Sequence, residues 1–600
     1  MLNPSVGNSR LFETLVRVLD SLRKEAPSAL AIYHPPAGNG DAMIQARSRA
    51  LLHLFLKARF GLVDFNTREL LVTDGKFDGG IDAYYIDQKA KLIYVLQSKF
   101  RATSTNFVSS NMSADDLLKM EVKRILSGEK RDEQGNDYND RIRKGLQKAI
   151  QQLPDVANYT TRVVLLGNSK RFSTAQLKKL VEGYAVDQFP HDRIYKELLY
   201  PVINGTYFTD PNLTIEIRLE NLKGDTHLDY SLKAHSLRAN IKLLFVPTLE
   251  MGRIMSTYRN SILKFNPRSF LELEGNPVNR QIEASIRDEL SNEFALFNNG
   301  ITIVSDGTAV SSDTAKPGSA QVVVRNPQLI NGGQTAYTLG RIHQGCLTPA
   351  DYKVFKGKEV LLKIITFVDP QTQDTVVPRQ KLVGEISKAS NAQTVVTALD
   401  RRSNDPIQIR LQELFFEKHG LYYERKLGEF SDGSLAGYIR PEHLVNRERI
   451  LRISLAADFK VNQARSSLNK FFGKDELAGQ LDVKNAEKYV FGYEVMMLLD
   501  AKLKDKNKPK GDRYRTSEFG QALRYGNYAV IAVSVNQAMT AGKNPEEAVK
   551  FVLGQWKAFE TWASKVESNS TYRAGGSFDF TNYYKGATIN SDLKAFTFSF

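Results

Sequence analysis

The chain has 600 residues, of which 82 are basic and 67 acidic, so its formal net charge is +15. This length is too great for one hydrophobic core, and two or more domains are expected. The basic surplus favours an anionic partner, most commonly nucleic acid. The sequence excludes a membrane protein, because no segment approaches the ~18 consecutive apolar residues of a membrane span.

The N-terminus and the cysteine content predict the compartment. Leu11, Leu15, Leu19 and Leu22 recur at helical spacing with charged residues between them, which indicates an amphipathic helix and not a signal peptide. The single cysteine, Cys346, forbids an intramolecular disulfide and fits a reducing cytoplasm. Zinc fingers and zinc ribbons are excluded, because neither CxxC nor HxxxH spacing occurs. We therefore expect a cytoplasmic protein.

The first 232 residues predict a linker region and one α/β domain. Residues 1–40 hold the amphipathic helix and a Pro/Gly-rich linker, and residues 41–232 form the expected domain. Strands are predicted at 68–73, 81–86, 92–100, 162–166 and 214–219, and helices at 42–60, 112–126 and 140–153. This order predicts an α/β domain.

Residues 233–600 are expected to form a second, larger α+β domain that becomes mainly helical after about residue 375. The predicted strands lie at 243–246, 294–297, 301–304, 322–324 and 360–367. Asn299-Gly300 predicts a hairpin between the second and third of these strands. Helical patterns follow at 336–342 and at 407–419, the latter ending at Gly420.

Gln97-Ser98-Lys99 follows Asp82 by 15 residues, on the second of two adjacent predicted strands. A tight turn at 87–90 would set Asp82 one or two positions from Gln97, and strand twist can close that gap. Side chains alternate along a strand, so Gln97 and Lys99 share one face. We predict that Asp82, the Gln97 side-chain oxygen and the Ser98 backbone carbonyl bind Mg²⁺, or Mn²⁺ in its place, because hard ions prefer oxygen ligands.

In this interpretation Lys99 positions the attacking water or stabilises charge that develops on a phosphodiester. Gly79-Gly80 would let a nucleic-acid backbone approach closely. The alternative is a surface hairpin with ordinary charges. A site of this kind does not choose the sugar, so DNA is the expected substrate and RNA stays open. Many nucleases cut both strands as dimers, and we expect a homodimer.

This segment resembles the PD-(D/E)xK restriction-endonuclease-like superfamily, especially its Mrr-like branch, in which glutamine often replaces the second acid. The resemblance covers about residues 41–170. It implies that Asp82, Gln97 and Lys99 are the catalytic residues of a Mg²⁺-dependent endonuclease with a restriction-endonuclease-like fold, in which helices flank a mixed sheet.

Mrr-like members often carry a glutamate on the first core helix, and this sequence departs from that pattern. Residues 42–60 contain no acid, and the nearest substitutes are Asp41 and Gln45. An alternative function follows from this departure and from the neutral Gln97. The protein would then bind nucleic acid or regulate a partner without cutting, on a nuclease fold that has lost its activity.

Three polar blocks in the second half carry further candidate residues. Asn331-Gly332-Gly333-Gln334-Thr335 lies between a strand and a helix N-terminus, which is an anion-binding geometry, although a plain capped helix has the same pattern. The block around residues 384–396 is either a polar loop between helices or a site for phosphates or a nucleobase edge. The candidate contacts to nucleic acid or nucleotide are Asn299, Asn331, Gly332, Gly333, Gln334, Thr335, Asn391, Gln393 and Arg402.

Together these blocks resemble the AIPR (abortive phage infection protein) family. Its hallmarks stand here in order as an NNGIT segment at 298–302, an NGGQT segment at 331–335, an SNAQTVV segment at 390–396 and a YERK segment at 423–426. The resemblance covers about residues 235–560 and implies a role in bacterial anti-phage defence. Family members commonly join this domain to an N-terminal restriction-like nuclease. The AIPR domain would then bind or sense nucleic acid or regulate cleavage, and the 331–335 loop could alternatively make the protein a nucleotide sensor.

Overall fold

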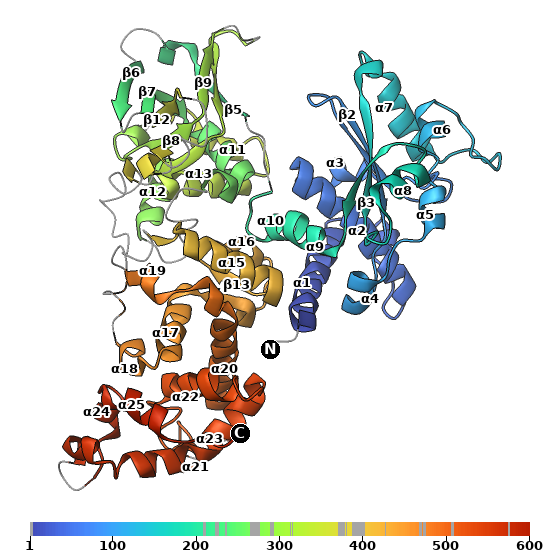
Figure 1. Ribbon diagram of the computed structural model, residues 1–600. Coiled ribbons are helices and arrows are strands. Elements are labelled where there is room, and N and C mark those ends of the chain that lie inside the picture. The colour runs from blue at the N-terminus through green and yellow to red at the C-terminus, as the bar shows by residue number, and fades with distance from the viewer. Residues whose placement is uncertain are drawn as a thin grey trace. The chain divides into compact units, whose positions relative to one another are not determined.

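The computed structural model describes residues 4–207, 212–222, 227–234, 237–263, 277–288, 293–312, 314, 316–369, 378–379, 381–383, 385–386, 402–426, 428–466, 468, 471, 476–505, 509, 511–573 and 577–600 (Figure 1). Two compact units are present. One comprises Asn8–Gln393 with Gly428–Ile439, and the other comprises Met1–Gly7, Thr394–Leu427 and Arg440–Phe600. The domain boundaries predicted at residues 40 and 232 stay predictions.

The N-terminal part of the first unit is built on a four-stranded sheet with the order β1-β2-β3-β4. β1 and β2 are antiparallel, whereas β3 is parallel to both β2 and β4. The sheet is therefore mixed, as predicted for an α/β domain. The bounds are β1 (Ala83–Asp87), β2 (Leu92–Ser98), β3 (Thr160–Leu166) and β4 (Ala185–Phe189).

The β1–β2 hairpin turns where the sequence predicted. The Asp87 side chain accepts a hydrogen bond from the Ala90 N–H (2.9 Å), and Lys91 takes a positive φ of 54°. Asp87 is paired with Leu92 across the turn, and Ala83 with Leu96 at the other end of the ladder. This register fixes which residues of β2 lie beside Asp82.

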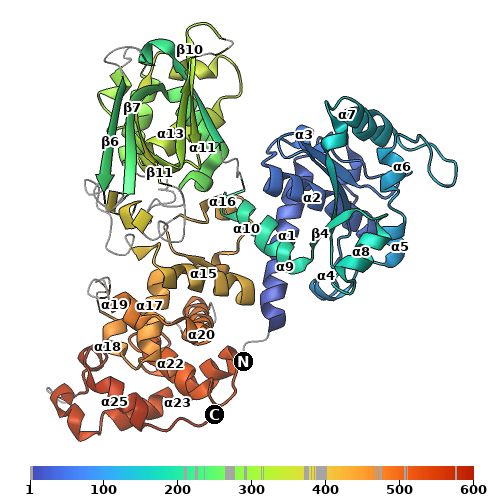
Figure 2. The ribbon, with the colours of Figure 1, turned by 45° about the horizontal axis from the view of Figure 1, so that its top comes forward.

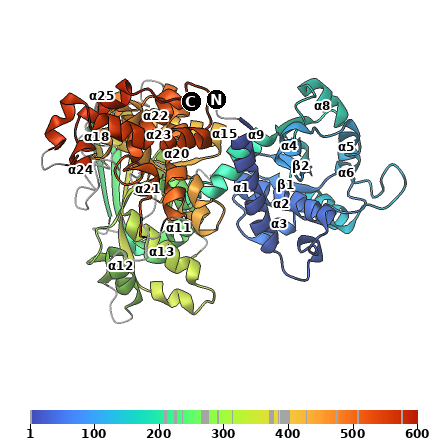
Figure 3. The same cartoon turned by 90° about the horizontal axis from the view of Figure 1, so that it is seen from below.

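Helices lie on both faces of this sheet, with α1 and α2 on one face and α5, α6 and α8 on the other (Figures 1 and 3). The α2 helix begins after Asn39, whose side chain accepts from the Ala42 N–H (3.0 Å), and ends at Gly61 in the left-handed conformation. The bounds are α1 (Pro4–Lys24), α2 (Gly40–Phe60), α3 (Phe65–Glu69), α4 (Ser104–Ser109), α5 (Ala114–Leu118), α6 (Val122–Leu126), the helical segment Arg141–Gln147 with α7 (Lys148–Gln151), α8 (Thr174–Leu180), α9 (His191–Arg193), Ile194–Leu199 and α10 (Tyr200–Ile203).

Two further sheets follow in the same unit (Figure 2). A three-stranded antiparallel sheet has the order β5-β10-β9, and a five-stranded sheet has the order β11-β8-β12-β7-β6. In the larger sheet β8 and β12 are parallel and the other neighbours antiparallel. The bounds are β5 (Asn212–Arg218), β6 (His227–Ala234), β7 (Leu237–Pro247), β8 (Ile301–Ser305), β9 (Gly307–Ser311), β10 (Ser319–Arg325), β11 (Gln328–Asn331) and β12 (Glu359–Phe367).

The helices α11 (Thr248–Tyr258), α12 (Pro277–Arg287) and α13 (Gly333–Gly345) accompany these sheets. Glycine lets α11 and α13 approach closely. A Cβ on Gly252 would lie 2.9 Å from the Leu339 carbonyl oxygen, and a Cβ on Gly340 would lie 2.9 Å from the Met255 Cβ. This contact fixes α13, and therefore the loop that precedes it, against the body of the unit.

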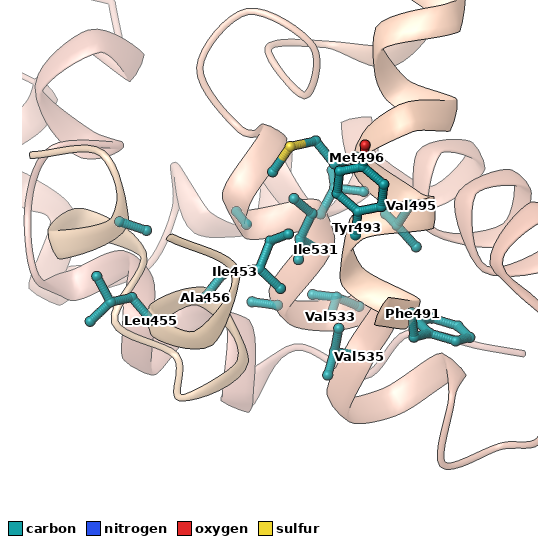
Figure 4. Packing of buried hydrophobic residues seen from close by; sticks show 14 of the residues in the cluster. Ile453, Leu455, Ala456, Phe491, Tyr493, Val495, Met496, Ile531, Val533 and Val535 are labelled. Atoms are coloured by element: carbon teal, nitrogen blue, oxygen red, sulfur yellow. The ribbon is translucent and has the colours of Figure 1, made fainter. Parts of the chain in front are cut away.

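The second unit is mainly helical, as the sequence predicted for the residues after about 375. Its core joins α17, α20 and α22, and a Cβ on Gly492 of α20 would lie 2.6 Å from the Ile453 Cγ2 of α17 (Figure 4). The bounds are α15 (Pro406–His419), α17 (Arg447–Ala457), α18 (Val461–Ala464), α19 (Glu476–Gln480), α20 (Ala486–Lys504), α21 (Thr516–Phe519), α22 (Asn527–Val533), α23 (Pro545–Ala563), α24 (Phe580–Tyr583) and α25 (Thr588–Ala595), with the parallel pair β13 (Tyr422–Glu424) and β14 (Leu444–Asn446). The short helix α16 (Ser431–Leu435) belongs to the first unit.

Three predicted elements were wrong. The strand predicted at 68–73 overlaps α3, because the Asp64 side chain caps a helix by accepting from the Thr67 N–H (2.7 Å). The hairpin predicted at 294–304 does not form, because the Asn298 side chain accepts from the Gly300 N–H (3.0 Å) and Glu293–Ala295 is helical. The helix predicted at 112–126 divides into α5 and α6, where the Gly79 carbonyl accepts from the Glu121 N–H (2.9 Å).

Candidate metal centre

Three aspartates of the loop before β1 form a carboxylate cluster. One carboxylate oxygen from each of Asp74, Asp78 and Asp82 lies within 4.8 Å of the other two. The loop folds back on itself, because the Asp82 carbonyl accepts from the N–H groups of Thr73 (2.8 Å) and Asp74 (3.0 Å). Residues eight positions apart in sequence thus share one small volume.

Asp78 closes this loop into a tight turn. Its two carboxylate oxygens accept from the Gly75 N–H (2.9 Å) and from the Gly80 N–H (2.8 Å). Each oxygen keeps a free lone pair after these bonds, so the turn leaves the Asp78 carboxylate able to bind a cation.

Asp82 is anchored to the end of β2. Its N–H donates to the Leu96 carbonyl (2.8 Å), and its carboxylate accepts from the Ser98 N–H (2.7 Å). Leu96 is the ladder partner of Ala83, so Asp82 comes directly before that pair along the chain and lies nearer to the level of Gln97 than the predicted turn placed it. The Ser98 carbonyl, a predicted metal ligand, accepts from the Ser48 hydroxyl of α2 (3.3 Å).

Like charges and burial act together on the cluster. Burial raises the pKa of Asp82 well above its usual value, the Asp74 charge raises it further, and the Ser98 N–H opposes the shift. Burial also raises the pKa of Asp78. The guanidinium of Arg49 on α2 pairs with Asp74 (Nε to Oδ2, 2.8 Å), so one fixed cation faces three carboxylates. A bound cation would relieve the remaining repulsion.

Gln97 of β2 and Lys99, the residue directly after β2, both contact Asp116 of α5. Gln97 Nε2 donates to the Asp116 carbonyl (2.8 Å), and the Lys99 ammonium lies 3.4 Å from the Asp116 carboxylate. Among the described residues, no hydrogen bond or ion pair joins Asp82 to the Gln97 or Lys99 side chain. Asp82 thus contacts the Ser98 backbone, whereas Gln97 and Lys99 are linked to each other by their shared contact with Asp116.

The Gln97 amide has one end unused. Its Oε1 is buried and accepts no hydrogen bond from any described residue. A buried acceptor without a donor costs free energy, on the order of 1–3 kcal/mol, unless a ligand satisfies it. Because Nε2 is held by Asp116, Oε1 is the end of the amide that is free to act as a metal ligand.

The donor set fits a hard divalent cation. Carboxylate and amide oxygens are the ligands that Mg²⁺ and Mn²⁺ prefer, and the described residues gather no cluster of histidine or cysteine ligands here. The carboxylates repel one another, and the Gln97 Oε1 on β2 is a further buried oxygen without a donor among the described residues.

The interpretation of Gly79-Gly80 was wrong. A Cβ on Gly79 would lie 2.6 Å from the Ile125 side chain, and a Cβ on Gly80 would lie 2.8 Å from the Lys119 carbonyl. The space that these glycines leave is filled by the protein's own α5–α6 segment. The glycines therefore let residues 74–82, which we call the acidic loop, pack inward, and they do not make room for a nucleic acid.

Asp74 and Asp78 were missed in the sequence. The suggested substitutes on the first core helix, Asp41 and Gln45, are both exposed, and α2 contributes Arg49 to the cluster instead. A signal was present nonetheless. Asp74, Asp78 and Asp82 recur every fourth residue in the glycine-rich stretch DGKFDGGID.

The NNGIT and NGGQT segments meet in the second part of the first unit. Asn298 Nδ2 donates to the Thr335 hydroxyl (2.9 Å), which joins the two segments. Gly332 precedes α13 with φ 77°, and a Cβ there would lie 2.5 Å from the Gly300 carbonyl oxygen. The structure thus brings the two motifs into direct contact.

The candidate residues of these motifs differ in environment. Asn331 accepts from the Gly332 N–H through its side chain (2.7 Å), and Thr335 is buried. Gly333 and Gln334, in the first turn of α13, are partly exposed, and Asn299 is exposed. Polar groups at this junction bond to one another, so the junction is organised by its own residues.

The remaining candidates lie elsewhere. Asn391 and Gln393 fall outside the described residues. Arg402 belongs to the second unit and pairs with the carboxylate of Asp405 (3.4 Å). None of the helices in the described ranges is both long and apolar enough to cross a membrane.

A family model described as AIPR protein matches residues 263–572, which is more than half of the chain. The matched residues include α12, the strands β8–β12 and the helices that follow them as far as α23. The chain belongs to the AIPR family. No curated protein and no solved structure matches the chain.

Proposed function

We propose that the N-terminal part of the chain is a Mg²⁺-dependent nucleic-acid endonuclease, acting on DNA, within an AIPR-family protein of anti-phage defence. The observation that carries this proposal is the cluster of Asp74, Asp78 and Asp82 beside the Gln97–Lys99 strand. A mixed sheet with helices on both faces supports a restriction-endonuclease-like fold, and the family match supports the defence role. The net charge of +15 supports a polyanionic substrate.

Each residue has a distinct part in the proposed chemistry. The cation would be held by Asp74, Asp78, Asp82 and the Gln97 Oε1. When bound, it would polarise the phosphate as a Lewis acid and lower the pKa of a water molecule bound to it. The Ser98 N–H orients the Asp82 carboxylate. Lys99, whose side chain is 42% exposed, can turn from Asp116 to a phosphate oxygen and stabilise the charge that develops there.

Cleavage of supercoiled plasmid with Mg²⁺ or Mn²⁺ tests this proposal. Wild type should cut, whereas Asp82→Ala and Lys99→Ala should lose at least about a hundredfold in rate, because each removes a group that acts on the transition state. Asp41→Ala removes an exposed acid of α2 and should cut as wild type does. Equal cleavage by wild type, Asp82→Ala and Lys99→Ala would sink the proposal.

One observation favours a second candidate, a protein that binds nucleic acid without cutting it. Lys99 is paired with Asp116 rather than with the aspartate cluster. In this candidate the lysine is structural, and the sheet is a binding surface. Salt-dependent DNA binding without metal-dependent cleavage would select this function over the first.

A further inference from the structure

The exposed tip of the acidic loop carries an aromatic residue in an unfavourable conformation. Phe77 lies between Asp74 and Asp78, has φ 59°, and is 38% exposed as a residue. L-residues other than glycine rarely adopt this left-handed region, and for a bulky residue the conformation is strained. Solvent exposure of the ring means that burial of apolar surface only partly offsets this strain.

The surrounding residues hold this conformation in place. The Phe77 carbonyl accepts from the Asn139 N–H (2.9 Å), while Asn139 Nδ2 donates to the Thr73 carbonyl (3.0 Å). Asp78 ties Gly75 to Gly80 through its two oxygens, as described above. Strain that neighbouring contacts enforce at a site is a sign of function, because a relaxed loop would be the default.

Phe77 also carries a cation next to its ring. The Lys76 ammonium lies 4.7 Å from the ring centroid, and Lys76 is itself exposed. An exposed aromatic ring with an adjacent positive charge provides both parts of a nucleic-acid contact, a stacking surface for a base and a charge for a phosphate. The backbone of the same loop places this pair within one to three residues of two carboxylates of the candidate metal centre.

We propose that Phe77 stacks on an unpaired base of the substrate strand, with Lys76 on a neighbouring phosphate, and so positions the phosphodiester at the aspartate cluster. The inference rests on the proposed nuclease function and names the substrate class as nucleic acid with an accessible base. Phe77 is a positioning residue here, since it contacts the base and not the reacting phosphate.

The chain supplies a matched control pair at the other end of β2. The Lys91 ammonium lies 5.0 Å from the Tyr159 ring centroid, and Lys91 also has a positive φ of 54°. This pair lies at the hairpin end of the sheet, away from Gln97 and Lys99. Substitutions at Tyr159 therefore test whether any cation–aromatic pair on this surface would act as Phe77 does.

Binding is measured on the full chain with Ca²⁺ replacing Mg²⁺, using single-stranded DNA and RNA oligonucleotides and blunt duplex DNA as probes. Phe77→Leu should weaken single-strand binding on the order of tenfold, because base–aromatic stacking is lost. Phe77→Trp should bind as wild type does, with quenching of the added tryptophan fluorescence that Tyr159→Trp does not show. Tyr159→Leu should bind within about twofold of wild type.

Phe77→Gly separates stacking from structure. Glycine tolerates the positive φ, so this variant should keep or raise the melting temperature while it loses single-strand binding as Phe77→Leu does. A Phe77→Gly protein that melts lower and binds normally would assign Phe77 a structural role and overturn the inference. Unquenched fluorescence in Phe77→Trp, or no binding of any probe by wild type, would also overturn it.

The outcome is distinguishable from that of the nuclease proposal. If wild type cuts plasmid and Phe77→Leu binds every probe normally, this inference fails and the nuclease stands. If Phe77→Leu loses binding while no protein cuts, the base contact stands and the nuclease fails. If Phe77→Leu loses more affinity for DNA than for RNA, DNA is the preferred substrate.

Discussion

Two polar regions of the first unit satisfy their hydrogen-bonding groups in opposite ways. At the junction of the NNGIT and NGGQT segments, Asn298 bonds to Thr335 and the Asn331 side chain accepts from the Gly332 N–H. In the acidic loop, one carboxylate oxygen from each of three aspartates lies within 4.8 Å of the other two, and the Gln97 Oε1 on β2 has no donor among the described residues.

The two regions therefore differ in how much a bound ligand would stabilise them. Groups that satisfy one another are stable without a ligand, whereas crowded and partly buried carboxylates repel one another, and a buried acceptor without a donor costs free energy. The sequence motifs of the family therefore organise the fold at the junction, and the less conspicuous aspartates of the loop make the stronger candidate for chemistry.

The largest expected effect comes from removing two charges of the cluster. Asp74→Asn with Asp78→Asn should lower metal-dependent cleavage more than about a hundredfold, because direct ligands matter at least as much as the outer-shell groups that orient them. The rate is measured by plasmid cleavage across a Mg²⁺ titration. Asp132→Asn together with Asp137→Asn, on a solvated loop of the same domain, is the control. An unchanged rate in the cluster variant would remove Asp74 and Asp78 from the site.

Glu560 of the helical unit shows that a raised pKa alone does not define a metal site. Burial raises its pKa to about 7, and its carboxylate accepts from the Gln521 N–H (2.9 Å) and the Tyr584 hydroxyl (2.7 Å). Because the folded pKa exceeds the ordinary value of 4.5, its contribution to stability is full below about pH 4.5 and is lost as the pH rises through 7.

The free energy of unfolding of this unit should therefore fall by about 3 kcal/mol between pH 4.5 and 8. The folded pKa of Glu560 lies about 2.5 above its ordinary value, and a pKa difference of 1 corresponds to about 1.36 kcal/mol. Urea denaturation at each pH, monitored by the fluorescence of Trp556 and Trp562, measures this free energy of unfolding. Glu560→Gln should flatten this pH dependence, and Mg²⁺ should not restore the lost stability in wild type. Restoration by Mg²⁺ would show that protein donors do not satisfy this carboxylate.

Gly332 tests the structural role of the motif junction. Gly332→Ala places a Cβ 2.5 Å from the Gly300 carbonyl at φ 77°, whereas Gly318→Ala has the same φ with nothing within 4 Å. The first variant should lose about 2 kcal/mol more than the second in free energy of unfolding, because it adds a steric clash to the same backbone strain. Urea denaturation of both variants compares them, and equal losses would show that the two motifs do not need their close contact.

Asn298 and Asn299 give the smallest expected difference. Asn298→Ala should cost about 1 kcal/mol through the lost bond to Thr335, and Asn299→Ala, at an exposed position, should stay within about 0.5 kcal/mol. Thermal melting distinguishes them. If Asn299→Ala instead leaves stability intact and weakens nucleic-acid binding, the junction also has a binding role.

Short-range pattern made much of the fold predictable. The β1–β2 hairpin and α15 ending at Gly420 with φ 61° both follow from alternation, turn chemistry and capping. The strand β4 was missed, because Asp187 and Gln188 interrupt the apolar residues of its short sequence AVDQF.

The acidic loop could not be predicted, because its shape depends on distant contacts. Asn139 holds the Thr73 and Phe77 carbonyls, and α6 fills the space beside Gly79. These partners are more than 40 residues away in sequence, and no local pattern indicates them. Thus Asp82 and the strand that carries Gln97 were predictable, whereas the loop shape that brings Asp74 and Asp78 beside Asp82 was not.

Binding of Mn²⁺ by wild type and by Asp82→Asn, followed by electron paramagnetic resonance, tests the central claim most directly. Asparagine keeps the shape of the side chain and its ability to accept from the Ser98 N–H, and it removes the charge that the cation requires. We expect a Mn²⁺ site in wild type that is lost in Asp82→Asn and unchanged in Asp41→Asn. The same stoichiometry and affinity in wild type and Asp82→Asn would contradict a metal centre at the aspartate cluster.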